Sequence, residues 1–197
     1  MADPSSTVTA IGRQASGRPV AVTGFLCANC SRPGEAPDSG GRSRPLIPSF
    51  DWPFPVTEIL VACTGRLQPE HVLKAFEHGA DLIFTVSCDE DNCQYLEGSE
   101  RWARRVDYVR SLLDEIGLGG ERLLHFHLPG CAAQDTALGA GRPEPACSYE
   151  AAGRITAIRD EVVQAAGRIP PNPLSLGLDD AAKDSYPQEI SDDDNED

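Results

Sequence analysis

The stretch "DLIFTVSCDEDNCQY" (residues 81–95) joins a continuous apolar run to two cysteines, Cys88 and Cys93, that stand among three carboxylates. A short apolar run rich in β-branched and aromatic residues is typical of a buried strand. Carboxylates beside a thiol raise its pKa, because a thiolate there experiences like-charge repulsion. The two thiols are therefore either ordinary loop cysteines or thiolates held by a strongly positive group.

The segments on either side of this stretch repeat the same arrangement of an apolar run followed by a helical pattern. Apolar runs of strand length cover residues 20–27, 56–63, 81–88 and 122–128. Helical patterns cover residues 68–79, 99–117 and 150–169, with Ser99 as the expected N-cap of the second. This alternation predicts an α/β fold with a small, mainly parallel sheet of about four strands and helices on both faces.

Three of the predicted strands end in a cysteine, namely Cys27, Cys63 and Cys88. The carboxyl ends of parallel strands lie along one edge of a sheet, where ligands characteristically bind. Cys30 and Cys93 stand in the loops beside two of these ends, so five thiols are expected to converge there. An iron–sulfur cluster or a metal ion would supply the positive charge that keeps such thiols deprotonated.

Other interpretations of the cysteines remain open. A C-x2-C pair also occurs as half of a zinc site or as a redox dithiol. The dithiol is disfavoured here because Pro33, Gly34 and Pro37 follow at once, where a thioredoxin-type motif needs a helix. His125 and His127 alternate along the fourth strand and are more typical of ordinary strand positions than of ligands. Cys131 and Cys147 have no metal-like spacing, and no arrangement of catalytic residues is present.

Charge and composition define the outer parts of the chain. Of the formal net charge of −14, residues 179–197 contribute −8, from nine acids and one lysine. We expect three parts: a flexible lead over residues 1–18, an α/β domain over 19–170, and a disordered acidic tail over 171–197. An acidic body with an acidic tail repels phosphate backbones, which argues against a nucleic-acid partner.

No apolar run approaches the ~20 residues of a membrane span, and the N-terminus lacks the apolar core of a secretory signal. The expected location is therefore the cytoplasm, where cysteines stay reduced or bind metals.

Residues 31–55 form a long insert rich in Gly, Pro and Ser, with little regular structure expected. Phe50, Trp52 and Phe54 lie close together at its end. They are either an anchor for a protein partner or a cover for the sheet.

Four blocks of the chain resemble the delta (iron–sulfur) subunit of methyl-viologen-reducing, F420-non-reducing hydrogenase. The blocks are "CANC" (27–30), "ACTGRLQPEHVLKAFEHGAD" (62–81), "SCDEDNCQYLEG" (87–98) and "RWARRVDYVRSLLDEIGLGGERL" (101–123). The first motif departs from the family's usual C-x3-C spacing, and Gln94 stands where a histidine is usual.

The resemblance implies a non-catalytic electron-transfer subunit that carries a [2Fe–2S] cluster. Its partners would be the flavin subunit of a heterodisulfide-reductase-like complex, together with a second oxidoreductase or hydrogenase subunit. The candidate ligands are Cys27, Cys30, Cys63, Cys88 and Cys93, one more than a cluster needs. The alternative function is a zinc-stabilised scaffolding module of a multi-subunit complex.

Overall fold

The structure, a computed structural model, describes residues 19–28, 30, 35–37, 43–45, 50–93, 95–129 and 144–175, with the side chains of 35–37, 43–45, 92 and 144–151 left out. The strands are β1 (Val22–Cys27), β2 (Glu35–Pro37), β3 (Ser43–Pro45), β4 (Val56–Val61), β5 (Leu82–Cys88) and β6 (Leu123–Leu128). The α-helices are α2 (Pro69–Glu77), α3 (Gly98–Glu115) and α4 (Glu144–Arg168), and the short 3₁₀ helices include η1 (Thr64–Arg66). The expectations for residues 1–18 and 176–197 lie outside the described residues.

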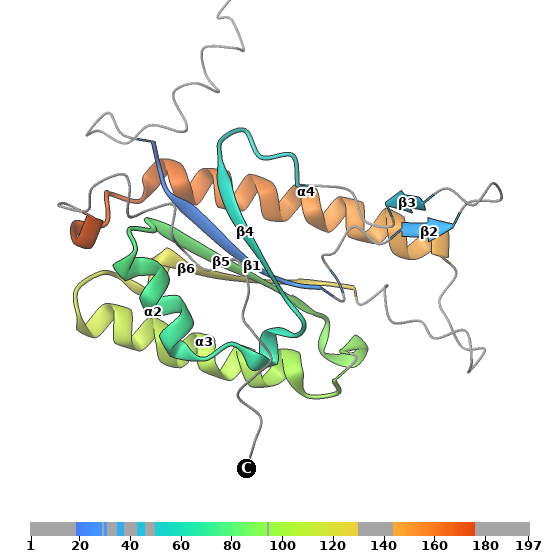
Figure 1. Cartoon of the computed structure of the whole chain (residues 1–197), viewed down its shortest axis with the longest axis horizontal. Coiled ribbons are helices and arrows are strands. Elements are labelled where there is room, and N and C mark those ends of the chain that lie inside the picture. Colours follow the sequence, from blue (N-terminus) through green and yellow to red (C-terminus); the bar gives the residue numbers. More distant parts are fainter. Residues whose placement is uncertain are drawn as a thin grey trace, which may run out of the picture.

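The predicted α/β class is confirmed. Four strands form one sheet in the order β4-β1-β5-β6, and every neighbouring pair is parallel. Helices α2 and α3 cover one face, and α4 lies along the other (Figure 1). Among the described residues, no helix is long and apolar enough to cross a bilayer.

The strand order places a topological switch point between β1 and β5. The chain leaves β1 toward β4 on one side, and it leaves β5 toward β6 on the other. In open parallel sheets a crevice forms outside two strand ends whose connections diverge in this way. Cys27 is the last residue of β1 and Cys88 is the last residue of β5, so both thiols stand at this crevice.

A stripe of apolar side chains on α3 packs against the face of the sheet that α2 and α3 cover. Trp102, Val106, Val109 and Leu113 are all buried and recur at helical spacing along α3. The Trp102 indole donates a hydrogen bond to Thr85 Oγ1 (2.9 Å), so its buried N–H is satisfied. Fully burying side chains of this size contributes roughly 1.5–3 kcal/mol each, which fixes α3 against the sheet.

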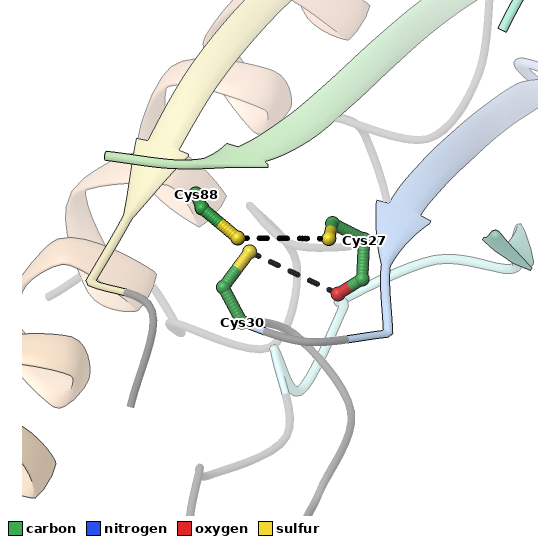
Figure 2. Close-up of side chains that lie close together, drawn as sticks. All are labelled: Cys27, Cys30 and Cys88. Atoms are coloured by element: carbon green, nitrogen blue, oxygen red, sulfur yellow. Dashed lines mark hydrogen bonds between the residues drawn. The ribbon is translucent and has the colours of Figure 1, made fainter. Parts of the chain in front are cut away.

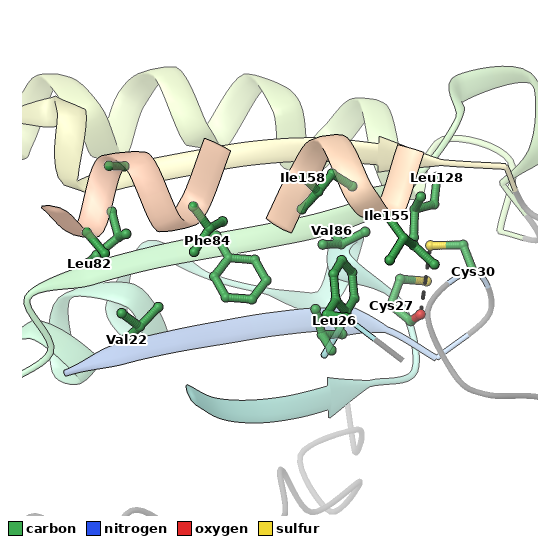
Figure 3. Packing of buried hydrophobic residues seen from close by; sticks show 14 of the residues in the cluster. Val22, Leu26, Cys27, Cys30, Leu82, Phe84, Val86, Leu128, Ile155 and Ile158 are labelled. Atoms are coloured by element: carbon green, nitrogen blue, oxygen red, sulfur yellow. Dashed lines mark hydrogen bonds between the residues drawn. The ribbon is translucent and has the colours of Figure 1, made fainter. Parts of the chain in front are cut away.

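The opposite face packs against α4. Ile155 and Ile158 of the helix meet Leu26, Val86 and Leu128 of the sheet, and Cys27 and Cys30 lie in the same buried cluster (Figure 3). The thiols are therefore continuous with the apolar core and are shielded from water on this side.

The aromatic residues at the end of the insert cover the sheet. Phe50 stacks on Trp52 with ring centroids 5.0 Å apart, and Trp52 contacts the ring of Phe84 at 5.1 Å. A Cβ at Gly24 would lie 2.3 Å from the Phe84 ring, so glycine there lets that ring lie across β1. These contacts agree with the covering interpretation, and the partner-anchor role of Trp52 stays a prediction.

Three local features differ from expectation. The insert contains the antiparallel hairpin β2–β3, whose strands are too short and too rich in proline to predict. Helix α3 begins at Gly98 with Glu97 as its N-cap, so Ser99 is not the cap. The described structure also continues past residue 170: Asn172 is buried and its amide N–H donates to Asp81 Oδ1 at 2.7 Å.

Candidate metal centre

Three thiols meet at the switch point. The Sγ atoms of Cys27, Cys30 and Cys88 all lie within 4.8 Å of one another. Cys27 Sγ and Cys88 Sγ are 3.6 Å apart, and Cys30 Sγ donates to the carbonyl oxygen of Cys27 at 3.8 Å (Figure 2). Each of the three residues is at most 2% exposed. Strand ends β1 and β5 and the turn after β1 thus build one buried sulfur group.

Cys63 and Cys93 approach this group from the side of α3. Cys63 stands two residues beyond the end of β4 and caps η1, and its Sγ accepts a hydrogen bond from the Gly65 amide at 3.4 Å. A Cβ at Gly98 would lie 2.4 Å from Cys63 Sγ and 3.2 Å from Cys93 Sγ. Both sulfurs therefore touch the first residue of α3.

A pair of glycines permits this approach. A Cβ at Gly65 would lie 2.6 Å from the Cα atom of Gly98, so the loop after β4 packs backbone against backbone on the start of α3. Arg105 strengthens the contact, because its Nη1 donates to the carbonyl oxygens of Gly65 and Leu67, each at 2.7 Å. The position of Cys63 is thus set by α3 as well as by its own strand.

Hydrogen bonds among the thiols shift their pKa values in opposite directions. Hydrogen bonds from the thiols of Cys30 and Cys63 lower the pKa of Cys27. Donating to Cys27 raises the pKa of Cys30 and of Cys63, and burial raises both further. A cation that replaced the shared protons would satisfy several thiolates at once. The donor set is therefore suited to a thiophilic metal centre.

One of the acidic residues beside Cys88, Asp89, is paired with an arginine. Arg154 of α4 donates to Asp89 Oδ1 at 2.6 Å, and this ion pair is partly buried. It ties the loop after β5 to the helix on the opposite face of the sheet from α3. The like-charge repulsion expected from the sequence is reduced at Asp89.

A pocket opens beside Cys63 on the surface. It has a volume of about 370 Å³, and Arg66, Gly98 and Arg101 are among the residues that line it. Tyr95 and Leu96 form part of its rim and are 55% and 83% exposed. The sulfur group is thus buried in the core on the α4 side, whereas Cys63, which lies beside it, lines a pocket at the surface.

The remaining candidates lie apart from the sulfur group. His127 Nδ1 lies 3.0 Å from the carbonyl oxygen of Cys88, and His125 Nδ1 lies 2.9 Å from Thr85 Oγ1. These contacts engage Nδ1 of each ring, and neither histidine joins the group of clustered thiols. Cys131 and the side chain of Cys147 lie outside the described residues.

Sequence reasoning brought the five cysteines to one edge but missed the glycines that bring them into contact. Gly65 and Gly98 matter because two segments 33 residues apart meet there, as the Cβ contacts show. The sequence does show a glycine two residues after Cys63 and another five residues after Cys93, but such spacings are too common to interpret alone.

Fold and site together define a class: a small, doubly wound α/β domain with a buried group of thiols at its switch point. Residues 22–137 match the family described as "Methyl-viologen-reducing hydrogenase, delta subunit". This match covers more than half of the chain, and the chain belongs to that family.

Individual relatives agree with this assignment. The chain is 36% identical over 104 residues to the iron–sulfur subunit of the F420-non-reducing hydrogenase vhc of Methanococcus voltae, covering 53% of this chain and 67% of the relative. It is 28% identical over 153 residues to the iron–sulfur subunit of the vhu hydrogenase of the same organism, covering 78% and 95%. It is also 34% identical over 102 residues to one chain of the ferredoxin:CoB-CoM heterodisulfide reductase of Methanosarcina mazei, covering 52% of this chain but 12% of that protein.

Proposed function

We propose that this chain is an electron-transfer subunit that holds a [2Fe–2S] cluster on cysteines from the set Cys27, Cys30, Cys63, Cys88 and Cys93. The observation that carries the proposal is the meeting of the buried thiols of Cys27, Cys30 and Cys88 at the switch point of the sheet, with Cys63 and Cys93 beside them against the start of α3. The relatives named as iron–sulfur subunits support it.

The residues present fit such a group. Iron–sulfur clusters are held by cysteine thiolates, and four suffice for a [2Fe–2S] cluster. When bound, the cluster accepts and returns one electron at a time. On the α4 side, the apolar side chains of Ile155 and Leu128 exclude water from the site. The backbone N–H of Gly65 donates a hydrogen bond to a cysteine sulfur. Both features favour retention of the cluster and influence its reduction potential.

The set contains one thiol more than a cluster needs. Single Cys→Ser variants at the five positions should therefore divide into four that lose most iron and one that retains it. We expect Cys27 among the four, because it interacts with thiols on both sides of the group.

The proposed role is a relay that connects a catalytic oxidoreductase or hydrogenase subunit with the flavin subunit of a heterodisulfide-reductase-like complex. Its support is that relatives of this domain occur as separate iron–sulfur subunits of hydrogenases and as a small part of a longer heterodisulfide reductase chain. A domain that is part of a longer chain in one protein and a separate subunit in another commonly binds that longer chain at the position it occupies in the fused protein. We therefore expect a partner that resembles this longer heterodisulfide reductase chain, in the cytoplasm, where the thiols stay reduced before assembly.

The test is anaerobic purification of the native complex, with iron and sulfide analysis and identification of the chains that copurify. The proposal predicts two iron and two sulfide per chain, a red-brown colour and an EPR signal on reduction. A colourless chain with one zinc would instead support the scaffolding module.

A further inference from the structure

The first turn of α3 lies against the sulfur group. The helix runs antiparallel to the strands, so its N-terminus is at the edge that carries the cysteines (Figure 1). Its first residue, Gly98, is buried and lies in contact with Cys63 Sγ and Cys93 Sγ, as the Cβ distances of 2.4 and 3.2 Å require. With 18 residues, α3 is long enough to carry a developed dipole.

Within the part of the chain that the structure describes, no side chain caps this helix end. Glu97 occupies the N-cap position but makes no capping hydrogen bond, and its carboxylate pairs with Arg101 instead. The first backbone bond of the helix runs from the Arg101 amide to the Glu97 carbonyl at 2.8 Å. The amides before Arg101 therefore have no intrahelical acceptor, and they give this end a partial positive charge.

Ser99 adds an independent observation. The residue is 1% exposed, and its Oγ atom has no hydrogen-bond partner among the described residues. Ser99 continues the stripe of Trp102 and Val106 that faces the sheet, one turn closer to the cysteines. A buried hydroxyl without a partner is rare and unfavourable in folded proteins.

Neighbouring buried hydroxyls are satisfied, which sets Ser99 apart. Thr64 Oγ1 and Ser87 Oγ lie 2.9 Å apart and bond to each other, and Thr85 Oγ1 accepts from Trp102. The same region thus pairs its other hydroxyls within the chain. The Ser99 hydroxyl is the one among these that has no hydrogen-bond partner among the described residues. The residue before it, Gly98, lies against Cys63 Sγ and Cys93 Sγ, so sulfur is the acceptor chemistry that its position in the helix offers.

We propose that the Ser99 hydroxyl, at the positive end of α3, donates a hydrogen bond to a sulfur of the bound centre and thereby raises its reduction potential. The sulfur is either a cluster sulfide or the thiolate of Cys63 or Cys93, and the inference rests on the proposed function. Donors and positive dipoles near sulfur stabilise the reduced state, which carries more negative charge. Ser99 acts as a positioning and tuning residue, not as a ligand.

The test is a spectroelectrochemical titration of the anaerobically purified full chain. Ser99→Ala removes the hydroxyl and leaves the Cβ atom in place, and Ser99→Thr keeps a hydroxyl while adding one methyl group. Ser111→Ala is the matched control, because Ser111 lies on the same helix, is exposed and bonds to the Tyr108 carbonyl. We expect Ser99→Ala to retain iron but to hold about tenfold less reduced cluster at a fixed potential, a shift of about 59 mV for a one-electron couple.

The outcomes separate the two proposals. If the wild-type chain contains no iron and sulfide, the proposed function is overturned and this inference with it. If iron is present and Ser99→Ala has the wild-type potential, only the role of Ser99 is overturned. If Ser99→Ala loses iron, retention of iron and potential in Ser99→Thr supports the hydroxyl, whereas loss in both variants shows that Ser99 serves packing alone.

Discussion

Substitution of Gly98 by alanine should weaken cluster binding without unfolding the domain. The added Cβ would lie 2.4 Å from Cys63 Sγ, whereas an ordinary contact between such atoms needs about 3.5 Å. One of the two must therefore move by about 1 Å. Metal ligands tolerate displacements of only about 0.2 Å from their bonding distances, so the required movement is about five times too large.

The helix cannot easily retreat to relieve this overlap. The backbone of Gly65 lies directly against Gly98, and Arg105 of the same helix bonds to the carbonyl of Gly65. Overpacking at such a site typically costs about 1–3 kcal/mol. Assigned to the cluster-bound state, that cost corresponds to a roughly 5- to 150-fold weaker retention of the cluster.

The metal-free protein should be affected far less. A thiol that is not ligated can rotate away, and alanine in a helix is more favourable than glycine by roughly 0.5–1 kcal/mol. Iron and sulfide content after anaerobic reconstitution should fall, while the melting temperature of the metal-free chain should stay near that of wild type.

Gly153→Ala is the matched control for this experiment. Gly153 also lies within a helix, α4, but a Cβ there would meet nothing within 4 Å. This variant should bind iron as wild type does and be slightly more stable. Full iron content and an unchanged EPR spectrum in Gly98→Ala would refute the placement of Cys63 and Cys93 beside the centre.

Three further predictions concern two of the candidate ligands, a buried histidine and the acidic C-terminal segment. Cys63→Ser and Cys88→Ser should each lose most iron and melt at a lower temperature, since ligation is coupled to folding; full iron with the wild-type EPR signal in either would exclude that residue as a ligand. Burial, aided by the nearby charges of His127 and Arg110, lowers the pKa of His125 to about 3. The folded chain then binds a proton at His125 less readily than the unfolded chain does. Above about pH 6.5 neither state is protonated there, and the free energy of unfolding is unaffected. As the pH falls below 6.5 the unfolded chain gains a proton, and the free energy of unfolding decreases by up to about 2 kcal/mol at pH 5. His125→Asn should flatten the dependence of melting temperature on pH between 5 and 7, and an equal slope in both proteins would contradict this. Deletion of residues 179–197 should leave the iron content unchanged, and a large fall in melting temperature would show that these residues pack on the domain.

Positions along strands could be predicted from sequence, because they depend on local pattern. Cys27 and Cys88 were placed correctly at strand ends, since each follows a short apolar run. The strand predicted over residues 56–63 ends two residues earlier in the structure, at Val61, so Cys63 lies beyond the strand. The reason is that "AC" after Val61 is apolar but already belongs to the turn into η1. Errors of this size are usual at element boundaries.

The role of Ser99 could not be predicted, because it depends on where the preceding turn ends. A serine before a periodic apolar stripe is the usual sign of an N-cap. Here the turn from Cys93 brings the Leu96 amide to the Cys93 carbonyl and the Glu97 amide to the Tyr95 carbonyl, at 2.9 and 2.7 Å. That turn delivers Glu97 to the cap position, so the helix starts before the serine and the hydroxyl of Ser99 is directed to a buried position.

The candidate cysteines and their neighbours connect all three layers of the domain. Cys27 and Cys88 belong to the sheet, Cys63 and Cys93 rest on the first turn of α3, and Arg154 of α4 holds the loop after Cys88 through Asp89. A centre bound by these thiols would therefore link α3 and α4 through the sheet edge, in addition to the apolar core and the hydrogen bonds that already hold each helix to the sheet and its loops. Ligation should consequently stabilise the cysteine end of the domain more than the opposite end, where Asn172 and Asp81 already form a buried network of hydrogen bonds. Hydrogen exchange that slowed equally at both ends on cluster binding would contradict this coupling.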